Sequence, residues 1–283
     1  STIMDAFGPP LPTTPVEHVD ERLPDGRRIV GEWVRAANAP APGNSCAAIY
    51  FLHGSGYAMC SARTHRRLTG WLSAHTALPV FCLDYRLAPR HRFPTAADDA
   101  HAGWEWLQHQ GFRPERLAVA ADSAGGHLAV DLLVHGGQPH PAALCLFSPL
   151  VDLTFDTARG RERDRPDPAI RAHHAARLVQ LYCHRTDPGH PRLAHDITTA
   201  RTFPPTLIQA GGAEMLAADA QLLADRIRAT GAHCDLQIWP DQVHVFQALP
   251  RLSPEATRAI REAARFLCAA IPVDAEEQSA CGH

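Results

Sequence analysis

Residues 117–127 of the chain read LAVAADSAGGH, and this stretch gives the strongest indication of the fold. It begins as a run of small apolar residues typical of a buried strand, and the residues after Ser123 continue with helical periodicity. A serine at such a junction, with the small residues Ala121 and Gly125 two positions before and after it, is typical of a nucleophile elbow, a strained turn that projects the serine Oγ above the sheet edge. Ala121 stands where the usual G-x-S-x-G pattern has glycine. The alternative is that Ser123 only caps the following helix.

Apolar runs rich in strand formers recur on both sides of this stretch, and helix-period segments separate most of them. The expected strands are 28–35, 47–52, 80–85, 117–121, 143–147, 206–210 and 234–239, and the expected helices are 61–75, 95–109, 124–135, 170–183, 217–229 and 254–270. This alternation predicts an α/β fold with a mostly parallel central sheet flanked by helices on both faces. The turn signal Pro24-Asp25-Gly26 adds an antiparallel hairpin at the start of the sheet.

The chain has 283 residues, of which 45% are hydrophobic, enough for one sizeable core. We therefore expect a single domain over 1–283. Two regions fall outside the alternation, 1–15 and 152–202, and the second is too long for an ordinary connection. Both are expected to form a small or reduced cap over the site, although 152–202 could instead be a solvated surface excursion. The tail 272–283 is expected to be flexible.

Charge and composition narrow the class of partner. The net charge of −3 and the pI near 6.6 give no electrostatic footprint for nucleic acid. No apolar run is long enough to span a membrane and the N-terminus lacks signal-peptide features, so we expect no integral membrane association and a cytoplasmic location. The eight cysteines show no C-x-x-C pair and no zinc-ligand spacing, so buried reduced thiols are expected. The expected partner is a small neutral molecule.

A second motif follows the strand expected at 47–52. Residues 53–57 read HGSGY and resemble the HGGG loop of lipases and esterases, whose backbone N–H groups stabilise the oxyanion of a tetrahedral intermediate. We expect Ser55 and Gly56 to donate from this loop and Ala124, the residue after the nucleophile, to supply the third N–H. Gly54 and Tyr57 are the expected substrate-binding neighbours. A structural glycine turn is the alternative.

A nucleophilic serine needs a base and an acid, and their order along the chain selects them from eighteen histidines. In hydrolases of this kind the acid and then the histidine follow the serine, each after a strand. His244 comes after the strand expected at 234–239, and Glu214 is the first carboxylate after the strand expected at 206–210. Asp219 and Asp152 are competing candidates for the acid.

With these residues in place, the chain resembles the hormone-sensitive-lipase-like family of bacterial esterases over about residues 47–267. Besides the loop and the elbow, residues 84–94, DYRLAPRHRFP, are similar to the family's D-Y-R-L-A-P-E-x-x-F-P segment, with Arg90 in place of its acidic residue. The resemblance implies an α/β-hydrolase fold and hydrolysis of short- to medium-chain carboxylic esters by Ser123, Glu214 and His244, without metal or cofactor. It also implies that Arg86 forms ion pairs beneath the site, and family members often form homodimers.

Other functions fit the same residues. A specialised deacetylase or acyltransferase acting on a natural product would share the site and differ in its acceptor. A non-catalytic ligand-binding protein is possible on any fold, although such proteins usually lose one of the three catalytic groups. Thiol chemistry at Cys60, near the oxyanion loop, has no supporting histidine or asparagine motif.

Overall fold

The computed structural model describes residues 14–137, 139–200, 202–250 and 253–271. Nearly all of the N-terminal segment 1–15, and the whole tail 272–283, lie outside the described residues, so the expectations for these parts concern residues of which no structure is given.

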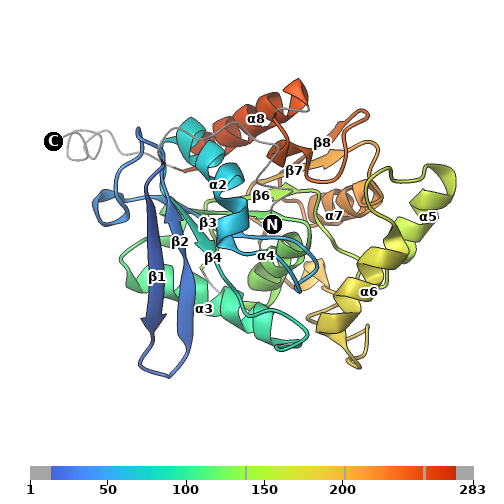
Figure 1. Cartoon of the computed structure of the whole chain (residues 1–283), viewed down its shortest axis with the longest axis horizontal. Helices are drawn as coiled ribbons and strands as arrows, with labels where there is room; N and C mark the ends of the chain where they lie inside the picture. Colours follow the sequence, from blue (N-terminus) through green and yellow to red (C-terminus); the bar gives the residue numbers. More distant parts are fainter. Residues whose placement is uncertain (1–13, 138, 201, 251–252, 272–283) are drawn as a thin grey trace.

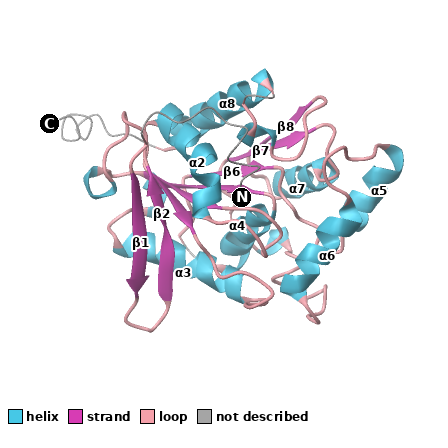
Figure 2. Ribbon diagram, viewed as in Figure 1, coloured by secondary structure: helices cyan, strands magenta, loops and turns pink. Residues whose placement is uncertain are grey.

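An eight-stranded sheet forms the centre of the described chain, in the order β1-β2-β4-β3-β5-β6-β7-β8 (Figures 1 and 2). The strands are β1 (Val16–Arg22), β2 (Arg28–Val34), β3 (Ala48–Leu52), β4 (Val80–Leu83), β5 (Leu117–Asp122), β6 (Ala143–Phe147), β7 (Thr206–Gly211) and β8 (Cys234–Trp239). Strand β2 pairs antiparallel with β1 and β4, and the pairs from β4 to β8 are parallel. The predicted fold class and the opening hairpin are confirmed.

Helices cover both faces of this sheet (Figure 1). They are α2 (Ala62–Thr76), α3 (Thr95–His109), α4 (Ala124–His135), α5 (Asp156–Asp164), α6 (Ala172–Cys183), α7 (Ala217–Ala229) and α8 (Pro254–Ala270), with short 3₁₀ turns at Pro42–Asn44, Pro114–Arg116, Ile197–Thr199 and Phe246–Ala248. Helices α2 and α8 pack on one face, whereas α3, α4 and α7 pack on the other. Strands β3 to β6 are buried on both faces, which explains their continuous apolar sequences.

The strand order gathers several loops at one edge of the sheet. Strand β5 lies between β3 and β6, and β3 pairs with it in a register that sets Leu52 beside Ala121. The loop after β3 therefore starts next to the turn after β5. Strands β7 and β8 run parallel to β5, so their carboxyl ends face the same edge. Open α/β sheets bind ligands at this edge.

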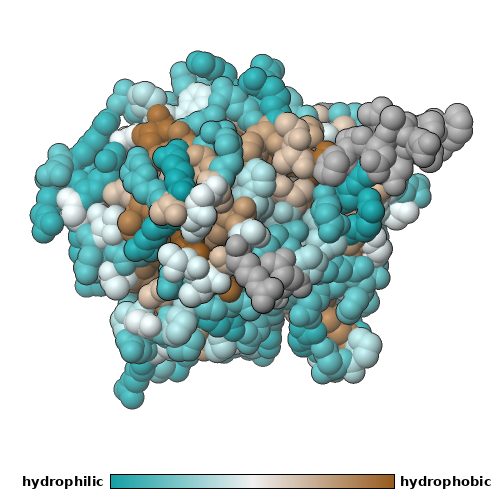
Figure 3. Space-filling view, turned by 180° about the vertical axis from the view of Figure 1, so that it is seen from behind, coloured by the Kyte–Doolittle hydropathy of each residue, from teal (hydrophilic) through white to brown (hydrophobic). Residues whose placement is uncertain are grey.

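Helices α5 and α6 belong to the segment 152–202 and stand together at the right of Figure 1, beyond the helices that cover the sheet. Helix α6 nearly coincides with the helix expected at 170–183, whereas the sequence did not locate α5. The face shown in Figure 3 is mostly hydrophilic, broken by several smaller apolar areas. Among the described residues, none of the helices combines the length and the apolar character needed to cross a membrane.

Candidate active site

Ser123 occupies the sharp turn between β5 and α4. Its backbone has φ 50° and ψ −120°, a conformation that a residue with a side chain rarely adopts. Its amide donates to the carbonyl of Phe147 (3.0 Å) and its own carbonyl accepts from Leu150 (3.0 Å), so neighbouring segments hold the strained turn. A Cβ on Gly125 would lie 2.0 Å from the carbonyl oxygen of Leu52, so only glycine lets α4 approach β3 this closely.

A continuous chain of hydrogen bonds joins Ser123, His244 and Glu214. The His244 Nε2 lies 3.0 Å from the Ser123 Oγ, and its Nδ1 lies 2.9 Å from the Glu214 Oε2. The Glu214 side chain is fully buried, and its other carboxylate oxygen accepts from the Gly211 amide at 3.3 Å. The structure therefore brings together the three residues that chain order selected, in the geometry of a nucleophile, a base and an orienting acid.

The surroundings of His244 set its affinity for a proton. Burial alone would lower the pKa of His244, but the hydrogen bond and the negative charge of Glu214 outweigh this and raise the pKa above its ordinary value of 6.5. A base with a raised pKa holds the serine proton more strongly once it has accepted it.

The two competing acids lie elsewhere. The Asp219 Oδ2 accepts the amides of Val151 and Asp152, at 2.8 and 2.9 Å. The Asp152 carboxylate accepts from Thr154 and Thr157 in its own turn. Neither carboxylate forms a hydrogen bond to His244 among the described residues, whereas the Glu214 carboxylate does.

The segment 152–202 supports the loop that carries Glu214, which the sequence did not suggest. Arg161 of α5 donates to the carbonyls of Glu214 (2.8 Å) and Gly212 (2.6 Å). The buried Asp167 accepts the amide of Met215 at 2.8 Å. These two side chains lie in the polar segment that was expected to form a cap, and no local sequence pattern relates either of them to the Glu214 loop.

The loop after β3 has the unusual backbone that its glycine-rich sequence predicts. Ser55 and Gly56 have φ values of 79° and 61°, and both line the cavity above Ser123. Ala124 is the first residue of α4 and directly follows the nucleophile. Gly54 and Tyr57 are not among the residues that line this cavity. Tyr57 is fully buried, with its ring stacked on Tyr182 at 4.2 Å.

A buried pair of charged groups lies beneath this loop. The Asp122 Oδ1 accepts the Gly54 amide (3.0 Å) and lies 3.4 Å from the His65 Nε2. Burial opposes the charge on both partners, but each charge stabilises the other: the pKa of Asp122 is lowered and the pKa of His65 is raised. The pair thus links α2, the elbow and the oxyanion loop. Sequence reasoning missed His65, because no local pattern relates it to Asp122.

The position expected of Arg86 needs correction. Its side chain is half-exposed and pairs with Asp99 of α3 at 2.7 Å, at the surface and not beneath the site. Cys60 accepts a hydrogen bond from the Ser55 hydroxyl (2.9 Å), so it contacts the oxyanion loop from its own turn.

A cavity of about 520 Å³ opens at Ser123 and His244. Apart from these polar groups its walls are mainly apolar, and α6 supplies one side of it. The apolar lining residues are Met59, Leu150, Phe155, Ile170, Ala175, Leu178, Val179, Met215, Leu216 and Val245. Such a cavity has the size and character of a small-molecule site.

Known proteins are similar to this chain in both sequence and fold. A family model described as alpha/beta hydrolase fold matches residues 49–248. The carboxylesterase/phospholipase LipF of Mycobacterium tuberculosis is 35% identical over 247 residues, which are 83% of this chain but 65% of LipF, so the chain spans less than two thirds of that relative. The esterase LipU of the same species is 36% identical over 244 residues, covering 83% of this chain and 82% of LipU.

A solved esterase structure from the bacterial hormone-sensitive lipase family superposes with a TM-score of 0.85. It is 31% identical, and the match covers 96% of this chain and 89% of that one. The family resemblance inferred from the motifs is thereby confirmed. The chain belongs to the α/β-hydrolase family and, within it, to the hormone-sensitive-lipase-like branch.

Proposed function

We propose that the chain is a serine carboxylesterase that hydrolyses esters of short to medium acyl chains through Ser123, His244 and Glu214. The observation that carries this proposal is the unbroken chain of hydrogen bonds, 3.0 and 2.9 Å long, from the serine through the histidine to the buried glutamate. The names of the relatives, a carboxylesterase/phospholipase and an esterase, support the same class of reaction.

In the first half of the reaction the Ser123 Oγ attacks the ester carbonyl carbon while His244 Nε2 takes the hydroxyl proton. The carbonyl oxygen becomes an oxyanion, and the backbone N–H groups of Ser55, Gly56 and Ala124 are the donors proposed for it. When the tetrahedral intermediate collapses, the bond to the alcohol oxygen breaks and His244 returns the proton to that oxygen. Glu214 stabilises the imidazolium while it exists.

In the second half a water molecule attacks the acyl-enzyme. His244 accepts one proton from this water, the acid is released, and the same proton returns to the Ser123 Oγ. The complete cycle therefore needs only the groups of this chain, the ester and one water molecule.

The size of the cavity favours substrates with acyl groups of limited length. Its volume of about 520 Å³ and its mainly apolar walls suit an alkyl chain that lies against α6.

The test is turnover of p-nitrophenyl acetate, butyrate and octanoate by the wild type and by Ser123→Ala. We expect the wild type to hydrolyse at least the two shorter esters. The substitution should lower kcat by at least about 10³-fold, because the nucleophile is lost. Cys145→Ser, a change of similar size in the neighbouring strand β6, is the matched control for folding. Equal turnover by the wild type and Ser123→Ala would overturn the assignment.

A further inference from the structure

A cluster of histidines lies on α4, on the side that packs against residues 190–196 of the insertion. His127, Asp131 and His135 are spaced four residues apart, so they share one face of the helix. The His127 Nε2 lies 3.2 Å from the carbonyl oxygen of Leu193, and the His135 Nε2 lies 3.1 Å from that of Pro191. This face of the helix therefore contacts the insertion directly, and His195 lies against it.

Three of these side chains form a set of donor atoms suited to a metal ion. One ligand atom each from Asp131, His135 and His195 all lie within 4.8 Å of one another. Ligands of a tetrahedral zinc ion, with bonds of about 2.0–2.1 Å, lie roughly 3.4 Å apart. Closing the set requires a shift of about 1.4 Å at most, and the exposed side chain of His135 would supply part of it, although its Nε2 contacts the Pro191 carbonyl at 3.1 Å.

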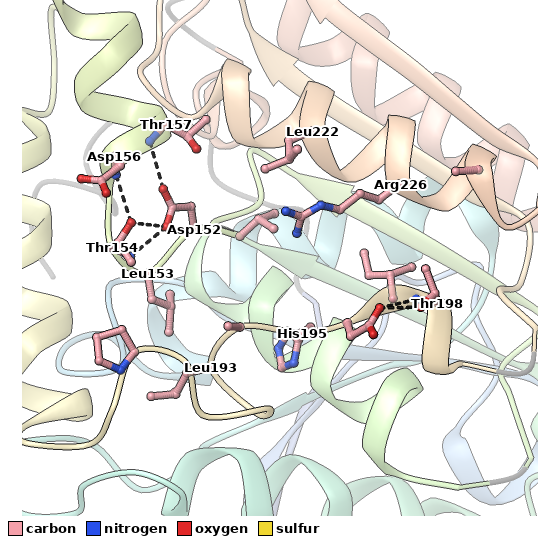
Figure 4. A pocket seen from close by; sticks show the side chains of 16 residues that line it. Asp152, Leu153, Thr154, Asp156, Thr157, Leu193, His195, Thr198, Leu222 and Arg226 are labelled. Atoms are coloured by element: carbon pink, nitrogen blue, oxygen red, sulfur yellow. Dashed lines mark hydrogen bonds between the residues drawn. The ribbon is translucent and has the colours of Figure 1, made fainter.

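His195 is the residue whose surroundings point to a ligand. Its side chain is only 3% exposed, yet neither ring nitrogen has a hydrogen-bond partner among the described residues. Buried polar atoms are nearly always partnered, so such an imidazole requires an explanation. The ring borders a cavity of about 660 Å³ between α7 and the segments 151–157 and 193–198, where Figure 4 shows it between Leu193 and Thr198. Of the three proposed donors, His195 is the one among the residues that line this cavity.

The Asp131 carboxylate is held in place by two neighbours. Its Oδ2 lies 2.8 Å from the His101 Nε2, and the Arg192 guanidinium donates to both of its oxygens. The same two side chains would fix the carboxylate from behind, as the outer partners of metal ligands usually do. The positive charge of Arg192 opposes a cation, so we expect a modest affinity.

We propose that Asp131, His135 and His195 bind one divalent transition-metal ion of the Zn²⁺ type, which fastens residues 190–196 of the insertion to α4. Two nitrogens and one oxygen are donors that suit this class of ion, and a water molecule would complete a tetrahedral site. The site lies two turns and more along α4 from Ser123 and contains none of the residues proposed for ester hydrolysis. Its role is structural, because it joins two segments that are far apart in the sequence.

The test is titration of the chelator-treated full chain with Zn²⁺ by calorimetry and with Co²⁺ by visible absorption. We expect one ion per chain and a tetrahedral Co²⁺ spectrum. His135→Gln and His195→Gln should each weaken binding by at least about tenfold, since each removes a ligand. At a Zn²⁺ concentration of about 100 times Kd, the wild type should melt about 5 °C higher than without the ion.

The matched control is the double variant His173→Gln, His174→Gln, which removes two exposed histidines whose rings lie 3.9 Å apart on α6. It should bind like the wild type. Because His135 is exposed, its variant tests the site even if His195→Gln lowers the stability. The proposal is overturned if no ion binds with a 1:1 ratio, or if His135→Gln and His195→Gln bind the ion as tightly as the wild type.

Discussion

At the scale of single residues, the charge on Glu214 controls the proton affinity of His244. The carboxylate is fully buried and lies 2.9 Å from the His244 Nδ1, so little solvent screens the interaction. The pKa of His244 is raised because this attraction outweighs the effect of burial. In the proposed mechanism His244 must be neutral to accept the serine proton. Activity should therefore fall as the pH drops through a value above 6.5.

Glu214→Gln tests this argument. The amide keeps nearly the same shape but carries no charge, so the raising effect on His244 is lost and its pKa should fall. The acid limb of the kcat/KM profile should move to lower pH, and the plateau should drop by at least about 10²-fold because the imidazolium loses its stabilising partner. The profile is measured with p-nitrophenyl butyrate between pH 5 and 9. A limb that stays in place or moves to higher pH would contradict the argument.

Individual residues differ in how far the sequence could identify them. The hydrogen-bonded group of Ser123, His244 and Glu214, whose catalytic role is proposed, could be selected from the sequence, because each residue follows an expected strand in the chain order of the family. His65 was not, since its partnership with Asp122 depends on how α2 packs against the elbow. Arg161 and Asp167 were hidden for a different reason: they support the Glu214 loop from a segment with the composition of a solvated surface.

At the scale of elements, the apolar strands and the amphipathic helices were predicted within a few residues. Helix α5 was not, because its sequence DTARGRERD has no apolar periodicity and only Ala158 is buried in it. Its polar side chains instead contact the body of the protein, as Arg161 does. The proposed metal ligands were equally hidden, since Asp131 and His135 lie on α4 but His195 lies in the insertion.

Helix α6 forms one wall of the cavity above Ser123, so its inner face should set the length of the acyl group. Leu178 lines the cavity and touches the oxyanion loop: a Cβ added to Gly56 would lie 2.8 Å from its Cδ2. Leu181, on the same helix, is 41% exposed and does not line the cavity.

Leu178→Ala should enlarge the cavity and favour longer acyl chains. We expect the ratio of kcat/KM for p-nitrophenyl octanoate to that for the acetate to rise by about tenfold, in keeping with the effect of a few methylene groups in an apolar pocket. Leu181→Ala removes the same atoms from the same helix and should leave the ratio unchanged. Equal ratios in both variants and the wild type would show that α6 does not limit the acyl group.

At the scale of the whole molecule, one buried carboxyl group makes stability depend on pH. Asp219 of α7 is fully buried, and its Oδ2 accepts the amides of Val151 and Asp152 at the start of the insertion. Burial raises its pKa from 3.8 to about 7, although these two hydrogen bonds oppose the rise. Its other oxygen has no hydrogen-bond partner among the described residues, which suits a protonated carboxyl group.

This raised pKa predicts a loss of stability as the pH rises from about 4 to about 7. In that window the folded chain keeps the Asp219 proton and the unfolded chain has released it, so the free energy of unfolding falls by up to about 1.4 kcal/mol per pH unit.

Asp219→Asn cannot ionise, yet its side-chain oxygen can accept the same two amides. In urea unfolding at pH 4 to 8, wild type and variant should diverge through this window, with the variant more stable at pH 8. Asp225→Asn, at an exposed position of α7, should follow the wild type, and a constant difference between wild type and Asp219→Asn would refute the raised pKa.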